Sequence, residues 1–378
     1  MSKANLADNI SPRVPVTELF FALIRCGIGK EEQLPATPTE QEWHKLFDIA
    51  KKQTLAGIAF AGIETLPQEQ RPPRNILLSW YKLSQTIRKK NAELNSKSAT
   101  VSEKFRREGF PNCILKGQGL AQLYPDPYLR TPGDIDIWLY GDSDKALAYV
   151  RKYFPDCKPT YHHVDFPIAE GLDIEIHYRP SWMCSPSKNK KLQAFFSKNA
   201  NDESATTINT AEGSFPAPSN TFNRIYILLH IYRHLFFEGI GIRQVLDYHF
   251  VTQQKITEGE KAEYIRLLKE LGLYKFATAA TYAMQRMFSA NETTTLVPPN
   301  KKEGEFLIRE ILAAGNFGQH DTRYKATRRG ANPTRIRDIV KRSYIMLTHY
   351  HSETLWNNYF KVWHWFWRRR HSTRHKNK

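Results

Sequence analysis

The sequence predicts an α+β fold, in which a small β-sheet unit lies between two helical segments. Three observations favour this fold class. The first hundred residues carry apolar side chains spaced three to four residues apart, as on one face of a helix. Residues 112–178 instead hold four short β-like runs. Helical patterns then return at about residue 219 and continue toward the C-terminus.

The N-terminal helical region is expected over residues 16–108, after a disordered leader over residues 1–15. Its first helix holds the apolar run ELFFALIRC, for which Thr17 is the expected N-cap. One long amphipathic helix is expected over residues 75–108, because its apolar residues keep a spacing of three to four and Gly109 follows them.

The α/β core with its connector is expected over residues 109–218. Its strand-like runs NCILK, DIDIWLY, YHHVDFPI and LDIEIHY begin at residues 112, 134, 161 and 172. A helical segment begins at Ser143. From Ser181 to Ser219 the chain is polar and rich in Pro, Ser and Asn, so we expect a connector with little core, with a hairpin around Glu212 and Gly213.

The C-terminal helical region, with a basic aromatic tail, is expected over residues 219–378. Its first helices are expected at about 219–237, 243–255, 259–289 and 302–316. A basic loop over residues 320–334 and two final helices rich in Arg, Trp and Tyr follow.

Composition and cysteine spacing limit the class of protein. No apolar run approaches the roughly 20 residues of a membrane-spanning helix, and the N-terminus lacks the apolar region of a signal peptide. The cysteines form no C-x-x-C pair, which argues against a zinc ribbon or a disulfide framework. They are Cys26, Cys113, Cys157 and Cys184. We therefore expect a cytoplasmic protein in a reducing compartment.

The positive charge gathers at the C-terminus. The formal net charge is +17, and residues 323–378 hold 15 Lys or Arg against two acids. Such a segment attracts nucleic acid, an anionic membrane surface or a polyphosphate, and charge alone does not choose among them. A solvated tail and an amphipathic helix that docks on the protein's own core are the alternatives.

Two aspartates interrupt an apolar run in the sequence GDIDIWL. Because side chains alternate along a strand, Asp134 and Asp136 share one face. Two carboxylates so close repel unless a cation, a proton or water compensates them. The run LDIEIHY repeats the pattern, with Asp173, Glu175 and His177 on one face. A third carboxylate is therefore expected on a neighbouring strand.

The order of the motifs indicates chemistry. In CILKGQGLAQLY a strand breaks at Gly117 and continues as a short helix, where backbone N–H groups suit a phosphate. A glycine turn, then two acids on the next strand, then an acid on a later strand is the order expected of a two-metal phosphoryl-transfer site. Taken singly, these motifs also fit an ordinary turn and a hydrated strand edge.

The stretch LKGQGLAQLYPDPYLRTPGDIDIWL, followed by LDIEIHYRPSW and LLHIYRHLFFEGIGIRQVLD, resembles the uncharacterised nucleotidyltransferases of the DNA polymerase β-like superfamily. The resemblance covers about residues 112–247. It implies a polymerase β-like nucleotidyltransferase sheet flanked by helical segments. It also implies a metal-dependent enzyme that moves an NMP group from an NTP to an acceptor hydroxyl.

The resemblance also implies metal ligands. By this match Asp134 and Asp136 correspond to the metal-binding pair and Glu175 to the third carboxylate, which together would hold two Mg²⁺ ions. Asp173 shares the face of Glu175 and is the alternative third ligand. The residue at position 118 is Gln118 rather than Gly or Ser, and its amide still offers a hydrogen bond to phosphate.

The expected nucleotide contacts are basic residues, a glycine and a glutamine. They are Lys116, Gly117, Gln118, Arg130 and Arg243. The planar guanidinium of Arg130 suits bidentate binding of a phosphate, and the alternative is a structural pair with Asp126 or with the sheet. Arg243 lies four residues before Asp247, so an ion pair between them is expected as well.

Other polar residues leave alternatives open. His230 and His234 have the i, i+4 spacing that lets two imidazoles bind one metal, but no third ligand is evident, and packing is the alternative. His177 and Arg179 are candidates either for contacts to the substrate or for contacts to the metal-binding side chains. The acceptor, whether a small molecule, protein or RNA, does not follow from the sequence. The competing interpretation is a non-catalytic nucleic-acid-binding or regulatory protein on a nucleotidyltransferase scaffold, and a third is a structural protein with a solvated acidic edge.

Overall fold

The α+β fold class is confirmed by the computed structural model. The described residues form a four-stranded sheet, a separate hairpin and helices on both sides of the sheet. They are residues 14–167, 173–200, 205–290, 295–323 and 333–372. Most of the expected leader and of the basic loop lies outside the described residues, as does the end of the tail.

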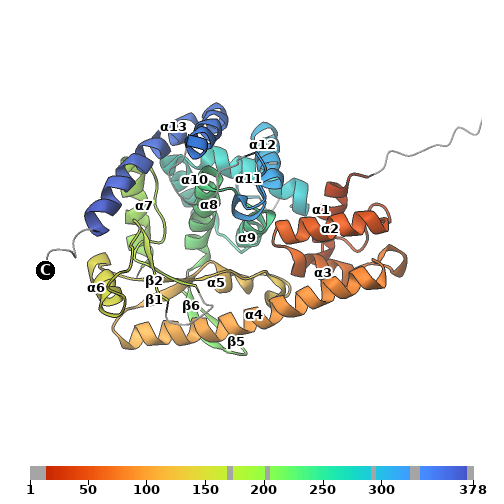
Figure 1. Ribbon diagram of the computed structural model, residues 1–378, viewed down its shortest axis with the longest axis horizontal. Helices are drawn as coiled ribbons and strands as arrows, with labels where there is room; N and C mark the ends of the chain where they lie inside the picture. The colour runs from red at the N-terminus through yellow and green to blue at the C-terminus, as the bar shows by residue number, and fades with distance from the viewer. Residues whose placement is uncertain (1–13, 168–172, 201–204, 291–294, 324–332, 373–378) are drawn as a thin grey trace, which may run out of the picture.

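Three short helices and one long helix form the N-terminal region. The short helices are α1 (Val16–Gly27), α2 (Glu40–Lys52) and α3 (Ala56–Thr65). Helix α1 begins after Pro15 without a side-chain cap, so the prediction of Thr17 as its N-cap was wrong. The long helix is confirmed as α4 (Arg74–Arg107), which ends just before Gly109 with its φ of 80°. Figure 1 shows α4 extending beneath the sheet.

The sheet has the strand order β1-β2-β4-β3. Its strands are β1 (Asn112–Leu115), β2 (Ile135–Leu139), β3 (His163–Asp165) and β4 (Ile174–His177), so each of the four predicted runs contains a strand. Strands β2 and β4 are parallel, and β1 and β3 pair antiparallel with them at the two edges. The connection from β2 to β4 includes the predicted helix α6 (Ser143–Tyr153), followed by β3.

The two faces of β2 contact different cores, as its alternation predicts. Ile135 and Ile137 belong to a core that also holds buried residues of α4 and α6. On the other face Trp138 stacks on Phe222 of helix α8 (Asn220–Phe237), with ring centroids 5.4 Å apart. The face that carries the acidic residues is therefore directed toward the C-terminal helices.

The segment after the sheet contains more structure than predicted. Helix α7 (Pro186–Asn199) buries Leu192 and Phe196, so the expectation of a connector with little core was wrong. These two apolar residues are four positions apart, which suffices for a helix that packs along one side only. The predicted hairpin is confirmed as β5 (Thr206–Thr210) and β6 (Gly213–Ala217).

The C-terminal region is helical to the end of the described residues. After α8 come α9 (Ile242–Thr252), α10 (Glu258–Leu271), α11 (Tyr274–Phe288) and α12 (Lys301–Ala314). The single helix expected over 259–289 is two helices, because Gly272 caps α10 in the left-handed conformation with φ 70°. Helix α13 (Pro333–Ser372) breaks at Tyr350, which agrees with the two final helices predicted.

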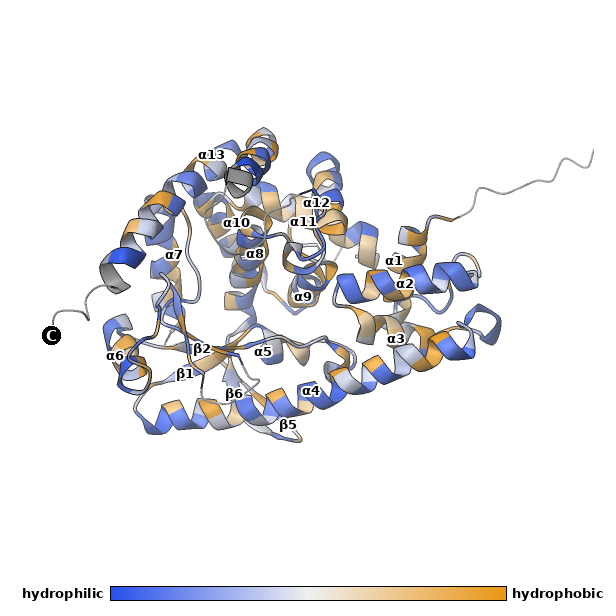
Figure 2. Ribbon diagram, in the orientation of Figure 1, coloured by the Kyte–Doolittle hydropathy of each residue, from blue (hydrophilic) through white to orange (hydrophobic). Residues whose placement is uncertain are grey.

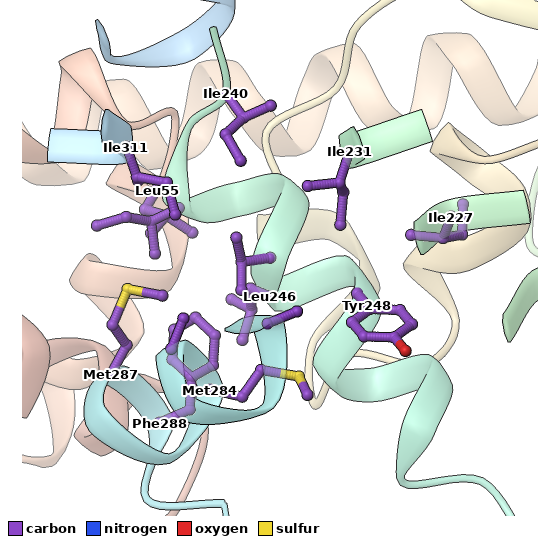
Figure 3. Packing of buried hydrophobic residues seen from close by; sticks show 14 of the residues in the cluster. Leu55, Ile227, Ile231, Ile240, Leu246, Tyr248, Met284, Met287, Phe288 and Ile311 are labelled. Atoms are coloured by element: carbon purple, nitrogen blue, oxygen red, sulfur yellow. The ribbon is translucent and has the colours of Figure 1, made fainter. Parts of the chain in front are cut away.

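The N-terminal and C-terminal helices share one hydrophobic core. Figure 3 shows Leu246 of α9 close to Met284 and Phe288 of α11, while Leu55 and Ile311 approach from the N-terminal helices and from α12. Figure 2 shows hydrophilic and hydrophobic residues interspersed along α4, as expected of a helix with one buried side. None of the described helices combines the length and the apolar character that crossing a membrane requires.

Candidate active site

Two of the predicted carboxylates meet on neighbouring strands. Asp136 of β2 and Glu175 of β4 are register partners in the parallel ladder. His177, at the end of β4, lies between their side chains. Its Nε2 atom is 2.8 Å from Oδ1 of Asp136 and 3.2 Å from Oε2 of Glu175. The strand register therefore creates a carboxylate pair joined by an imidazole.

Asp136 lies between two basic side chains. It is only 1% exposed, and Nζ of Lys116 lies 2.9 Å from its Oδ2 atom. Burial alone lowers the pKa of Lys116, but the charges of Asp136 and Asp134 outweigh burial and raise that pKa. Burial likewise opposes a charge on His177, yet its hydrogen bonds to Asp136 and Glu175 raise its pKa to about 9. The buried carboxylate is thus neutralised from both sides.

Strand β3 adds groups that the sequence analysis did not assign. Nδ1 of His163 lies 3.4 Å from Oε2 of Glu175, and Asp165 is the register partner of Glu175. Burial raises the pKa of Glu175, but the His177 hydrogen bond and the nearby His163 outweigh it and lower that pKa to about 2. Burial lowers the pKa of His163 to about 4. In the run HHVD, His163 and Asp165 are two positions apart and so share one face of the strand. This spacing is the signal that could have identified them as site residues.

The acids and histidines of this region are suited to a divalent metal ion. Carboxylate and imidazole groups are common ligands of such ions. Among the described residues, three sets have ligand atoms within 4.8 Å of one another: Asp136, Glu175 and His177; His162, His163 and His177; and His163, Asp165 and Glu175. Asp134 belongs to none of these sets.

Asp134 instead lines a pocket beside the carboxylate pair. Four of the expected nucleotide contacts line the same pocket: Lys116, Gly117, Arg130 and Arg243. Ile227 and His230 of α8 and the ring of Phe317 form other parts of its wall. The cavity volume is about 30 Å³, which is room for one or two water molecules. The structure therefore gathers most of the predicted phosphate contacts around one narrow pocket, which Asp134 and Asp247 also line.

The two arginines of the pocket have partners other than those predicted. Arg130 makes two hydrogen bonds of 2.8 Å to the carboxylate of Asp247. Arg130 thus makes a structural pair, as the alternative predicted, but with Asp247, because Asp126 is bound to Arg88. Nη1 of Arg243 donates to the carbonyl of Thr131 at 2.9 Å, and Asp247 pairs with Arg130 instead.

Each of these arginines keeps one buried nitrogen without a hydrogen-bond partner. They are Nη1 of Arg130 and Nε of Arg243. An unpaired buried donor costs free energy, of the order of 1–3 kcal/mol, and more for a charged group. An anion in the pocket would therefore remove that cost.

The turn after β1 directs Lys116 and Gly117 to the site. Lys116 has φ 40° and Gly117 has φ 37°, both in the left-handed region. A non-glycine residue there is strained, and such strain is often found at functional sites. The side chain of Gln118 points elsewhere, since its Nε2 donates to Oδ1 of Asn95 on α4 at 2.6 Å. Gln118 is thus not brought together with the other expected contacts.

The remaining candidates lie apart from the carboxylate pair. Asp173 is exposed before β4, and its carbonyl accepts a hydrogen bond from the N–H of Ile135 at 3.0 Å. The rings of His230 and His234 are in contact, with centroids 4.3 Å apart, but no set of three metal-ligand atoms among the described residues includes them. Arg179 donates to the carbonyl of Tyr161 and stacks on its ring.

Comparison with known proteins gives the family. A family model described as uncharacterised nucleotidyltransferase matches residues 39–289. Among solved structures, the chain is similar to an antigenic nucleotidyltransferase-like protein from Paracoccidioides brasiliensis, with 14% identity and a TM-score of 0.30. That match covers 48% of this chain and 93% of the other. No curated protein matches the chain. Because the family model spans about two thirds of the sequence, the chain belongs to the family of uncharacterised nucleotidyltransferases, whose general role is nucleotidyl transfer.

Proposed function

We propose that the protein is a metal-dependent nucleotidyltransferase that moves an NMP group from an NTP to an acceptor hydroxyl. One observation carries the proposal: Lys116 contacts the buried Asp136 and also lines the pocket that holds Arg130 and Arg243. A carboxylate pair suited to a cation therefore adjoins a pocket suited to phosphates. This adjacency is what transfer of a phosphoryl group requires.

The pocket's own residues would bind and orient the triphosphate. Nη1 of Arg130 and Nε of Arg243 are buried donors that lack a partner, and charged donors form strong hydrogen bonds to phosphate oxygens. Lys116 would add a third positive charge. Because the cavity is only about 30 Å³ in volume, a triphosphate requires its walls to separate. Phe317, whose backbone has φ 50°, is the wall residue that we expect to move.

Asp134, Asp136 and Glu175 would hold the metal ions, for which we propose Mg²⁺ with two ions bound. Their oxygens are the ligands that Mg²⁺ prefers. When bound, the ions would neutralise charge on the phosphates and lower the pKa of the acceptor hydroxyl. Asp173, which is exposed before β4, would be a bystander.

The acceptor is proposed to be an anionic molecule in the cytoplasm. Lys and Arg residues are concentrated at the C-terminus, which favours an acceptor with negative charge, such as RNA or a phosphorylated small molecule or protein. All four cysteines are free, which agrees with a reducing compartment.

Labelled nucleotides test the proposal directly. The purified protein is incubated with each α-³²P-labelled NTP, Mg²⁺ and a cell extract, and labelled products are separated. We expect one class of acceptor to become labelled, with loss of labelling on chelation and in Asp136→Asn, and with retention in the Asp173→Asn control. Equal labelling by wild type and Asp136→Asn would contradict the proposal. Nucleic-acid binding without any labelling would favour a non-catalytic binding protein.

A further inference from the structure

Three histidines lie next to one another beside the carboxylate of Glu175. The histidine cluster consists of His162 and His163, at the start of β3, and His177, at the end of β4. Nδ1 of His163 lies 2.9 Å from Nε2 of His162 and 3.4 Å from Oε2 of Glu175. Nε2 of His177 lies 3.2 Å from the same carboxylate oxygen. Nitrogen atoms of the three histidines therefore lie within 4.8 Å of one another, with Glu175 in contact with two of the rings.

The separations of these atoms match those within a metal coordination shell. With metal–nitrogen bonds of about 2.0–2.1 Å, neighbouring ligand atoms lie roughly 3.3 Å apart in a tetrahedron and roughly 2.9 Å apart in an octahedron. The three contacts in the histidine cluster and Glu175 are 2.9, 3.2 and 3.4 Å long. The nitrogens of the three histidines, which lie within 4.8 Å of one another, would have to close up around a bound ion.

The surroundings hold the imidazoles in place. Nδ1 of His162 lies 3.1 Å from the hydroxyl of Thr160, which leaves Nε2 to face His163. The ring of Trp182 covers His162 at a centroid distance of 4.1 Å. His163 and His177 are register partners in the β3–β4 ladder. A hydrogen bond to the second ring nitrogen and a fixed ring plane are typical of histidines that bind metals.

The ligand set favours a transition metal. Imidazole nitrogen is a good ligand for Zn²⁺ and related ions, whereas Mg²⁺ prefers oxygen ligands. We propose that the histidine cluster forms a binding site for a divalent transition-metal ion of the Zn²⁺ class. The site adjoins Glu175 of the proposed transfer chemistry, but its existence does not depend on that chemistry. An ion bound there would place a fixed positive charge in the wall of the active site, next to Asp136.

Cobalt titration of the full-length, chelator-stripped protein tests this site. Co²⁺ bound to imidazole ligands absorbs visible light, so binding is read without any nucleotide. We expect one equivalent of Co²⁺ to bind, to be displaced by Zn²⁺ and to be unaffected by millimolar Mg²⁺. His162→Gln and His163→Gln should each weaken binding by at least about tenfold. The matched control is His234→Gln, since His234 lies in a histidine pair outside these metal-ligand sets.

Two results would overturn the site: no visible band with Co²⁺, or equal Co²⁺ affinity in wild type and a folded His162→Gln/His163→Gln double variant. Circular dichroism and the melting temperature show whether that variant is folded. The outcome is separate from the test of transfer. A protein that binds Co²⁺ but labels no acceptor contradicts only the proposed function, while labelling with Mg²⁺ and no Co²⁺ binding contradicts only this site.

Discussion

Arg130 and Asp247 form a buried bidentate ion pair that joins the segment before β2 to helix α9. Nε and Nη2 of Arg130 each donate to one carboxylate oxygen of Asp247 at 2.8 Å. The hydroxyl of Tyr124 donates to the same carboxylate at 2.7 Å. The side chains are 3% and 7% exposed. One wall of the pocket is therefore fixed by a contact between the sheet unit and the C-terminal helices.

Removing the negative charge of this pair should strongly destabilise the protein. Asp247→Asn leaves the Arg130 guanidinium buried and uncompensated, for which we expect a loss of about 3–5 kcal/mol in the free energy of unfolding. Urea denaturation at pH 7 measures it. The control Asp126→Asn affects a half-exposed pair with Arg88 and should cost no more than about 1 kcal/mol. Similar losses in the two variants would show that burial of the pair does not matter.

The two aspartates of β2 should differ in their effect on stability. In Asp136→Asn the half-buried Lys116 and the buried His177 lose their shared carboxylate, so the metal-free protein should be destabilised by about 3–5 kcal/mol. Asp134 is only half-buried, and Asp134→Asn should change stability by less than about 1 kcal/mol. Both variants should lose nucleotidyl transfer. A melting temperature of Asp136→Asn equal to that of wild type would contradict the structural part of this prediction.

Substitutions on β4 should separate the two candidates for the third metal ligand. Glu175 is the register partner of Asp136, whereas Asp173 is exposed before the strand. Glu175→Gln should therefore lower the transfer rate by at least about 100-fold, as loss of an essential ligand does, and Asp173→Asn by less than about threefold. Single-turnover rates at saturating NTP measure both. The reverse ranking would assign the ligand to Asp173 and leave the mechanism unchanged.

A buried histidine that belongs to none of the metal-ligand sets should make stability depend on pH. Burial lowers the pKa of His249 from 6.5 to about 4. As the pH falls, His249 is therefore protonated in the unfolded chain before it is protonated in the folded protein. The stabilisation by neutral His249 is complete above pH 6.5 and is lost as the pH falls toward 4. The loss from this residue should reach about 2 kcal/mol at pH 5. His249→Leu should accordingly lose less stability than wild type between pH 7 and pH 5.

Unfolding by urea at the two pH values tests the role of His249. The control is His44→Leu, at an exposed position on α2, which should lose as much stability as wild type. If His249→Leu also shows the full wild-type loss, the pH dependence comes from other groups.

Removal of the basic end of the chain should weaken binding of anions without unfolding the protein. Truncation after Trp367 keeps the ring contacts of Trp367 and Phe360 with Tyr161. It deletes Arg368, Arg369, Arg370, Arg374, Lys376 and Lys378. Binding of a single-stranded oligoribonucleotide should fall, and the slope of log affinity against log salt should decrease by up to about 4. A lower melting temperature with an unchanged slope would place this segment in the folded core instead.

The sequence by itself determined the elements and the faces of the strands. The alternation of DIDIWLY places Asp136 and Trp138 on one side of β2, because a strand has a local period of two residues. The apolar spacing of three to four similarly predicted α4 almost to the residue. Helix α7 was missed, because two apolar residues in a polar stretch give too weak a local pattern. Local periodicity thus sufficed to predict a helix or strand wherever that element buries a continuous apolar side.

Only the tertiary structure decided which side chains meet. Asp247 bonds to Arg130, 117 positions away in the sequence, rather than to Arg243 on its own helix. The pairing of β3 with β4 brings His163 to Glu175, which no spacing within either run indicates. Such contacts depend on strand register and helix packing, which are set by the burial of the whole core. The sequence therefore predicted the acidic face, whereas the ligand atoms that surround it were determined by packing between distant segments.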